Sequence, residues 1–140
     1  HPNFILWISG HRHLNTVKAF TSNDPLNAPE RGFWQVETSS LRDFPQQFRT
    51  FQIYLNSDNT VSIVTTNVDP AVKEGTPAAQ SRSYAVAAQQ IINNDIYNVN
   101  PNQDPSIKPM PTGSYNAELI KQLSPEMQKK LQKLFMSAEK

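Results

Sequence analysis

Hydrophobic residues in the first part of the chain follow the spacing of β-strands. Residues 3 to 9 are nearly all apolar, which is typical of a strand covered on both faces in the middle of a layered structure. Gly10 ends this run. Apolar and polar residues then alternate over residues 16 to 21, and the extended pattern resumes over residues 32 to 38. The sequence therefore predicts three strands, the first of them buried.

A β-hairpin is predicted next. Residues 48 to 55 and 60 to 66 are rich in β-branched and aromatic side chains, and the Asn, Ser and Asp residues between them are turn formers. Trp7 and Trp34 lie in two of the earlier predicted strands, where rings of this size are typical of core or inter-sheet packing. We expect both rings to pack against other strands.

Beyond residue 70 the pattern changes to helical spacing. An Ala- and Gln-rich segment carries apolar residues on one helical face and ends near Asn93 and Asn94. A Pro-rich connection follows over residues 98 to 113, and its composition predicts an extended segment. The apolar face of the predicted helix consists of Tyr84, Ala87, Ala88, Ile91 and Ile92.

A second helix is predicted at the end of the chain. Ser124 is a suitable N-cap, and Pro125 after it is suited to the first helical position. An apolar stripe follows, and the lysines of this segment lie largely off it, which is typical of a helix that packs on one side. The stripe consists of Met127, Leu131, Leu134 and Phe135, and the lysines are Lys129, Lys130 and Lys133.

The fold class that these elements predict is α+β. Residues 1 to 70 form a β-rich segment, and residues 71 to 140 form a helical extension that includes the Pro-rich connection. The chain of 140 residues has the size of one ordinary domain, and we expect the two parts to form one structural unit.

Composition excludes several classes of function. The formal net charge of +1 produces no field that gathers nucleic acid or an anionic membrane surface. No window approaches the roughly 18 apolar residues of a membrane span. The absence of cysteine excludes disulfides and thiolate metal sites. The chain begins at His1 with neither an initiator Met nor a signal-peptide pattern, so we expect it to be part of a longer protein.

Two of the three histidines, His11 and His13, stand one residue apart directly after the first predicted strand. In extended backbone, residues i and i+2 point to the same side, so both imidazoles can converge on one metal or on two neighbouring metals. Arg12 between them then points away or reaches an anionic ligand at the same centre. Their second ring nitrogens need hydrogen-bond partners, and Asn15 and Thr16 are close in sequence.

The run ILWISGHRHLNTV, residues 5 to 17, resembles the Gly-His-x-His motif of the calcineurin-like metallophosphoesterases. The resemblance covers roughly residues 3 to 67 and implies the C-terminal part of a layered α/β/β/α sandwich. It also implies that His11 ligates one metal, that His13 ligates the other, and that Gly10 shapes the turn. In this family two divalent metals, Mn, Fe or Zn, bind the phosphate of an ester and activate the attacking water.

The other metal motifs of the family are missing from this chain. A two-metal site needs more than two histidines, commonly with a bridging carboxylate, and His1 is the only other histidine. We therefore expect a fragment of a phosphoesterase that requires the N-terminal part of the same protein, and we expect the isolated chain to be inactive. Arg12, Arg31 and Arg42 are candidates for contact with the phosphate-ester substrate, although each is more simply a surface residue.

Two other functions stay open. A non-catalytic β-rich interaction module would carry His-x-His incidentally or bind a single metal through it. In either case, strands of a fragment that have lost their neighbours expose edges, which favours pairing with another copy of the chain. A cupin-like metal site is the third alternative, but the next glutamate after the histidines is Glu30, too far along the chain for that pattern.

Overall fold

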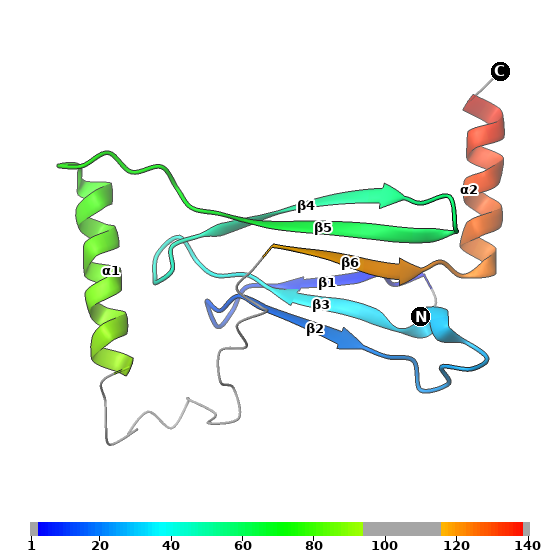
Figure 1. Ribbon diagram of the computed structural model, residues 1–140, viewed down its shortest axis with the longest axis horizontal. Coiled ribbons are helices and arrows are strands. Elements are labelled where there is room, and N and C mark those ends of the chain that lie inside the picture. The colour runs from blue at the N-terminus through cyan, green and yellow to red at the C-terminus, as the bar shows by residue number, and fades with distance from the viewer. Residues whose placement is uncertain (1–2, 94–115, 139–140) are drawn as a thin grey trace.

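The computed structural model describes residues 3–93 and 116–138. These residues form a mixed α+β fold, which confirms the predicted fold class, with helices and strands arranged as Figure 1 shows. In chain order the elements are β1 (Leu6–Ser9), β2 (Thr16–Phe20), the 3₁₀ turn η1 (Pro29–Arg31), β3 (Phe33–Glu37), β4 (Phe48–Leu55), β5 (Thr60–Val68), α1 (Pro77–Asn93), β6 (Ala117–Gln122) and α2 (Pro125–Ala138).

The described strands form two sheets of three strands each. In the first sheet β3 lies between β1 and β2, parallel to β1 and antiparallel to β2. In the second sheet β5 lies between β4 and β6 and is antiparallel to both. The one parallel pair brings the C-terminal ends of β1 and β3 to the same edge, where Ser9 is in register with Glu37.

The core lies where the two sheets pack against each other. Val36 of β3 and Ile63 of β5 are the central residues, and neither side chain is accessible to solvent. Burial of one such side chain stabilises the fold by about 1.5–3 kcal/mol. The buried cluster consists of Val36, Val61, Ile63, Leu119 and Leu123, and the partly buried residues packed on it include Ile5, Leu6, Val17, Trp34, Phe51, Met127 and Leu131.

A hydrogen bond also joins the two sheets. The indole Nε1–H of Trp34 in β3 donates to the carbonyl oxygen of Ile120 in β6, at 2.9 Å. Because this ring also packs on the core cluster, the predicted packing role of Trp34 is confirmed.

The predicted position of the first strand is wrong. β1 pairs only with β3 among the described strands and therefore lies at an edge of its sheet. Trp7 is 51% exposed and Ile8 is 50% exposed, so the expected packing of Trp7 is also wrong. An apolar run predicts a strand, but it does not fix how many neighbours the strand has.

The predicted hairpin is confirmed as β4 and β5. Its turn is closed by the Asn56 N–H, which donates to the Thr60 carbonyl at 2.9 Å, while Asn59 adopts a left-handed φ of 65°. β6 was not predicted, because the sequence gives only six residues of weak alternation there. It nevertheless completes the second sheet, with Leu119 in register with Ile63.

Both predicted helices are present. α1 covers Pro77–Asn93, up to the limit of the described residues, and Tyr84 and Ile91 on its apolar face are largely exposed. In α2 the Ser124 Oγ accepts a hydrogen bond from the Met127 N–H at 3.2 Å, which confirms the predicted N-cap. The Pro-rich connection over residues 98 to 113 lies outside the described residues.

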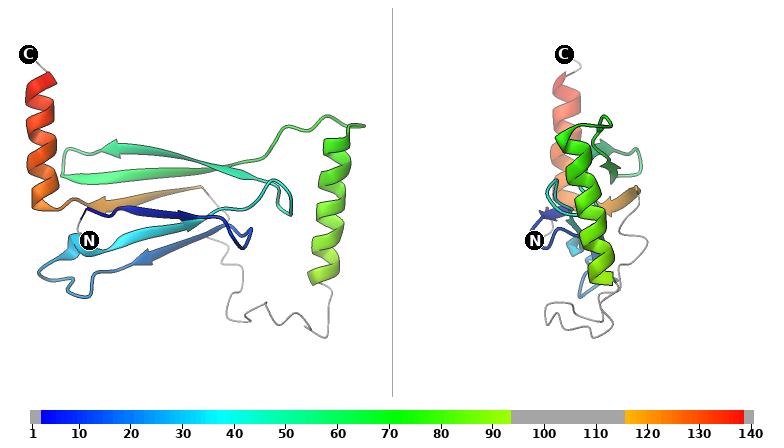
Figure 2. Two further views of the ribbon diagram at one scale, coloured as in Figure 1. Left: turned by 180° about the vertical axis from the view of Figure 1, so that it is seen from behind. Right: turned by 90° about the vertical axis from the view of Figure 1, so that its left-hand side faces the viewer.

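The helices do not form layers over the sheets. Figure 2 shows α1 and α2 at opposite ends of the strands, so the layering of a metallophosphoesterase sandwich is not confirmed. In the described part of the chain, no helix is both long enough and apolar enough to cross a membrane.

Candidate functional site at the ends of β1 and β3

The loops that follow β1 and β3 meet because these two strands are parallel. The Thr38 N–H donates to the Ser9 carbonyl at 2.8 Å and extends the pairing by one residue. The first loop then carries the Gly-His-x-His motif, and the second leads through Ser39 to Asp43. In α/β sheets, the loops at the C-terminal ends of parallel strands are a common position for ligand sites.

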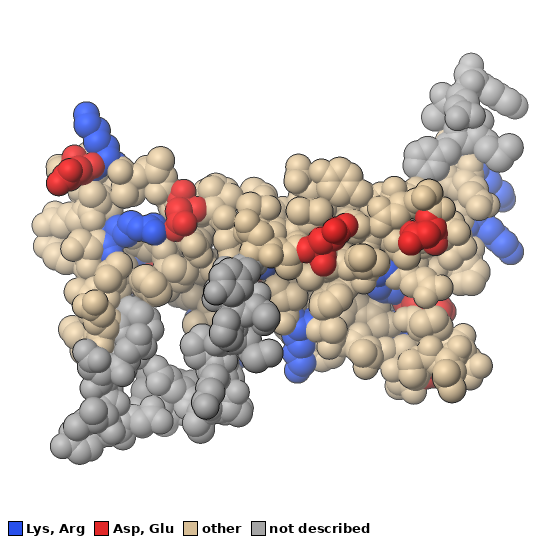
Figure 3. Space-filling view, viewed as in Figure 1, with Lys and Arg blue, Asp and Glu red and all other residues tan. Residues whose placement is uncertain are grey.

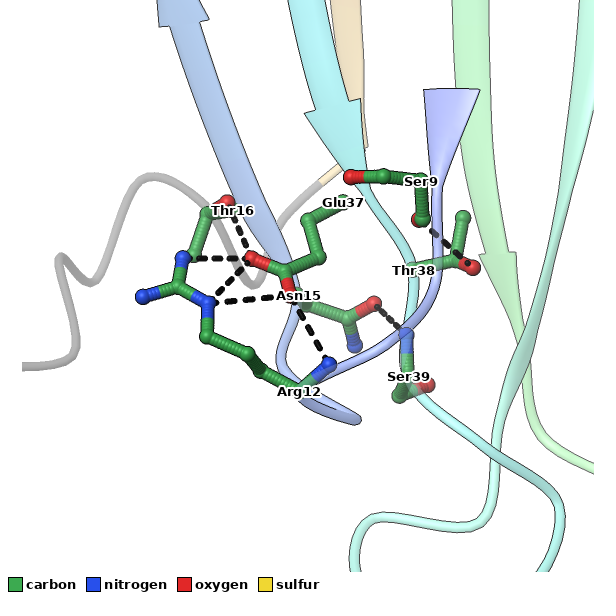
Figure 4. A network of polar contacts seen from close by, with 7 residues as sticks. All are labelled: Ser9, Arg12, Asn15, Thr16, Glu37, Thr38 and Ser39. Atoms are coloured by element: carbon green, nitrogen blue, oxygen red, sulfur yellow. Dashed lines mark hydrogen bonds and ion pairs between the residues drawn. The ribbon is translucent and has the colours of Figure 1, made fainter. Parts of the chain in front are cut away.

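Arg12 is tied to Glu37 at the end of β3. Its Nε donates to both carboxylate oxygens at 3.1 Å, its Nη2 donates to Oε2 at 2.5 Å, and its backbone N–H donates to Oε1 at 3.1 Å (Figure 4). The Glu37 residue is only 4% exposed. A two-pronged contact of this kind is among the stronger charge-assisted interactions. Arg12 therefore holds the loop that follows β1 against the end of β3.

The carboxyl of Glu37 is stabilised in its ionised form. Burial alone raises the pKa of Glu37, but the hydrogen bonds and the charge of Arg12, with a smaller contribution from the Thr16 hydroxyl, outweigh it. The pKa of this carboxyl consequently lies below its usual range.

Asn15 forms a second link between the two loops. Its Oδ1 accepts a hydrogen bond from the Ser39 N–H at 3.0 Å (Figure 4), and its Nδ2 donates to Gln47 Oε1 at 2.9 Å. Asn15 and Thr16 were expected to contact the second nitrogens of the histidines. In the described residues, their side chains bind Ser39, Gln47 and Glu37 instead.

The two motif histidines lie beyond the end of β1. The backbone bends at His11 and Arg12, and His13 adopts a left-handed φ of 58°. The predicted convergence of the two imidazoles required an extended backbone, and the backbone here is not extended. The reason is the Arg12–Glu37 contact, which turns the loop back toward β3. His11 is exposed and His13 is half-buried.

The His13 ring contacts Asp43 of the second loop through a short hydrogen bond between Nδ1 and Oδ2. The loop residue Asp43 is held in turn by its neighbours: its N–H approaches Ser40 Oγ at 3.4 Å, and its carbonyl accepts from the Gln46 N–H at 2.7 Å. Asp43 stands in no recognised motif, and the sequence alone does not single it out. Only the fold reveals its role, because the two residues are 30 positions apart.

Histidine is a side-chain type that can ligate divalent metals. A histidine whose Nδ1 binds a carboxylate is a typical ligand through Nε2. Within residues 3–93 and 116–138, however, no group of three or more His, Cys, Asp or Glu side chains is placed to hold a metal ion. Further ligands would have to come from outside the described chain.

A pocket of about 480 Å³ lies between the second loop and α1. Asp43 lines it together with Arg42, Phe44 and Tyr84, so the residue that contacts His13 also borders this space. Arg31 and Arg42 are both exposed, as expected of surface residues. Figure 3 shows positive and negative side chains interspersed on the face it displays, with no extended surface of one sign.

No protein family, curated protein or solved structure matches the chain.

Proposed function

We propose that this chain supplies the last metal-binding segment of a calcineurin-like, metal-dependent phosphoesterase. In this proposal His11 ligates one divalent metal and His13 ligates the other, with Mn, Fe or Zn as the candidates. When bound, the metals orient the phosphate ester and activate the attacking water. The remaining ligands belong to an N-terminal part of the same protein, and the complete sandwich has α/β/β/α layers.

One observation carries the proposal. The Gly-His-x-His loop follows the C-terminal end of β1, next to the loop that follows its parallel neighbour β3. Arg12 fastens the first loop to Glu37 at the end of β3, and His13 joins it to Asp43 of the second loop. A histidine pair in a mobile polar segment is not expected to have such contacts. Among the described strands β1 has a neighbour on one side only, and its Trp7 and Ile8 are half-exposed, which also favours an additional strand from the rest of the protein.

The experiment compares alanine variants of the three histidines in the longer protein. With p-nitrophenyl phosphate and added Mn²⁺, we expect His11→Ala and His13→Ala each to lower kcat/KM by at least about 100-fold. Loss of a residue that only hydrogen-bonds to a metal ligand lowers activity by up to about 100-fold, and loss of the ligand itself should cost at least as much. His1→Ala is the matched control and should retain activity. Near-wild-type activity in either motif variant would remove that residue from the metal centre, and the isolated chain should show no turnover.

A non-catalytic interaction module is the second candidate, and the exposed apolar residues of β1 favour it. Here the edge of β1 pairs with a second copy of the chain. This candidate predicts that Trp7→Lys abolishes self-association in sedimentation equilibrium, whereas His11→Ala and His13→Ala leave it unchanged.

The phosphoesterase proposal fails if the sequence upstream of His1 lacks carboxylate and histidine metal motifs.

A further inference from the structure

We infer that Asp43 is a positioning residue that fixes the tautomer of His13 and so presents the Nε2 atom of this ring for metal ligation. The inference rests on the proposed function and adds to it a residue from a different loop. Its structural basis is the contact between His13 Nδ1 and Asp43 Oδ2.

The direction of this hydrogen bond follows from the chemistry of the two groups. An ionised carboxylate only accepts hydrogen bonds, so the proton between the two atoms belongs to Nδ1 of His13. In the neutral ring the other nitrogen, Nε2, then carries a lone pair. Free imidazole side chains favour the opposite tautomer, with the proton on Nε2. Asp43 therefore selects the form that can ligate a metal through Nε2.

The local structure holds both partners in place. His13 lies in a left-handed conformation (φ 58°), so its position depends on the turn braced by Arg12 and Glu37. Asp43 lies in a turn closed by Gln46, whose Nε2 also donates to the Arg42 carbonyl at 3.2 Å. Two independently braced turns thus determine where the carboxylate meets the ring.

His11 offers an internal comparison. No hydrogen bond joins its ring to another of the described residues, so no carboxylate among them selects a tautomer of this ring. If Asp43 acted only on overall stability, its substitution would change the spectra of both histidine rings alike. If it positions His13, its substitution changes the tautomer of the His13 ring alone.

The test measures the tautomers directly by long-range ¹H–¹⁵N correlation spectroscopy of the metal-free chain at pH 8. We expect the wild-type His13 ring to be protonated at Nδ1. Asp43→Ala should move the proton to Nε2, and Asp43→Asn, whose amide oxygen still accepts, should preserve the wild-type tautomer. Asp58→Ala is the matched control because this aspartate lies in the distant β4–β5 turn. Retained backbone amide spectra show that each variant is folded.

A second measurement follows ligation through the line broadening of the His13 ring signals by Mn²⁺. We expect Asp43→Ala to need about 10–100-fold more Mn²⁺ for the same broadening. A wild-type ring protonated at Nε2, or an unchanged tautomer in Asp43→Ala, would overturn the inference. If the tautomers are as expected but Mn²⁺ broadens neither motif histidine, even with the N-terminal part present, the metal centre of the proposed function fails instead.

Discussion

Arg12 donates to both carboxylate oxygens of Glu37 and thereby fastens the loop after β1 to the end of β3. Glu37→Gln removes the negative charge but keeps the size of the side chain. We expect the free energy of unfolding to fall by about 2 kcal/mol, since hydrogen bonds to charged groups contribute about 1.5–3 kcal/mol. Urea denaturation followed by circular dichroism measures this difference. The exposed Glu118 is the matched control, and Glu118→Gln should change stability by less than about 0.5 kcal/mol.

The contribution of Glu37 should also depend on pH. Because its pKa is lowered in the folded protein, the stabilisation is fully present above the unfolded value of 4.5 and is lost as pH falls through the folded pKa. The stability difference between the wild type and Glu37→Gln should therefore shrink below pH 4.5. A difference that stays constant down to the acid transition would show that the carboxylate charge contributes nothing.

The contribution of Lys121 to the free energy of unfolding should increase with pH. Burial lowers the pKa of Lys121, although the charge of Glu30 acts in the opposite direction. Since the unfolded chain then binds more protons, stability should rise as pH increases from the folded pKa toward 10.5. Lys121→Met should abolish this rise in urea denaturation series, and Lys133→Met, at an exposed position, should leave it intact. An identical rise in Lys121→Met would assign it to another group.

Gly32 should tolerate alanine far less well than the motif glycine. A Cβ at residue 32 would lie 2.7 Å from the Phe20 carbonyl oxygen, which is backbone and cannot move aside easily. A Cβ at Gly10 would meet the Thr38 hydroxyl at 3.3 Å, and a side chain can adjust. We expect Gly32→Ala to cost about 2–3 kcal/mol and Gly10→Ala less than about 1 kcal/mol by thermal denaturation. The reverse order would contradict the close approach of β2 to residue 32.

Trp34→Phe should weaken the contact between the two sheets. The phenyl ring keeps most of the packing but loses the hydrogen bond to the Ile120 carbonyl, so we expect a loss of about 1 kcal/mol in the free energy of unfolding. Trp7→Phe removes the same indole group at a half-exposed position and should be nearly neutral. Equal effects of the two variants would show that the inter-sheet hydrogen bond does not contribute.

The strands of the first half of the chain were predictable because their patterns are local. The hairpin of β4 and β5 combines β-branched strands with a turn of suitable residues, and the N-cap at Ser124 is likewise a short-range signal. The edge position of β1 was not predictable, since Trp7 and Ile8 are as apolar as buried residues. β6 is too short and too weakly alternating to be distinguished from a loop.

The candidate site was predictable only in part. The spacing of His11 and His13 singled out their loop, and the β1–β3 pairing places this loop beside a second one. The partners could not be read from the sequence, because Glu37 and Asp43 are distant from the residues that they contact. The bend at Arg12 likewise depends on a tertiary contact, so local rules predicted an extended backbone instead.

The pairing of β6 with β5 brings residues such as Thr60 and Gln122 into register across a long sequence separation. Contacts of this kind form late, because closing a long loop costs conformational entropy before they stabilise the chain. During synthesis the β4–β5 hairpin emerges well before β6, and an isolated hairpin is at best marginally stable in water. The apolar surface around Ile63 is therefore buried only when Leu119 pairs with it, and the last fifth of the polypeptide determines when this sheet becomes stable.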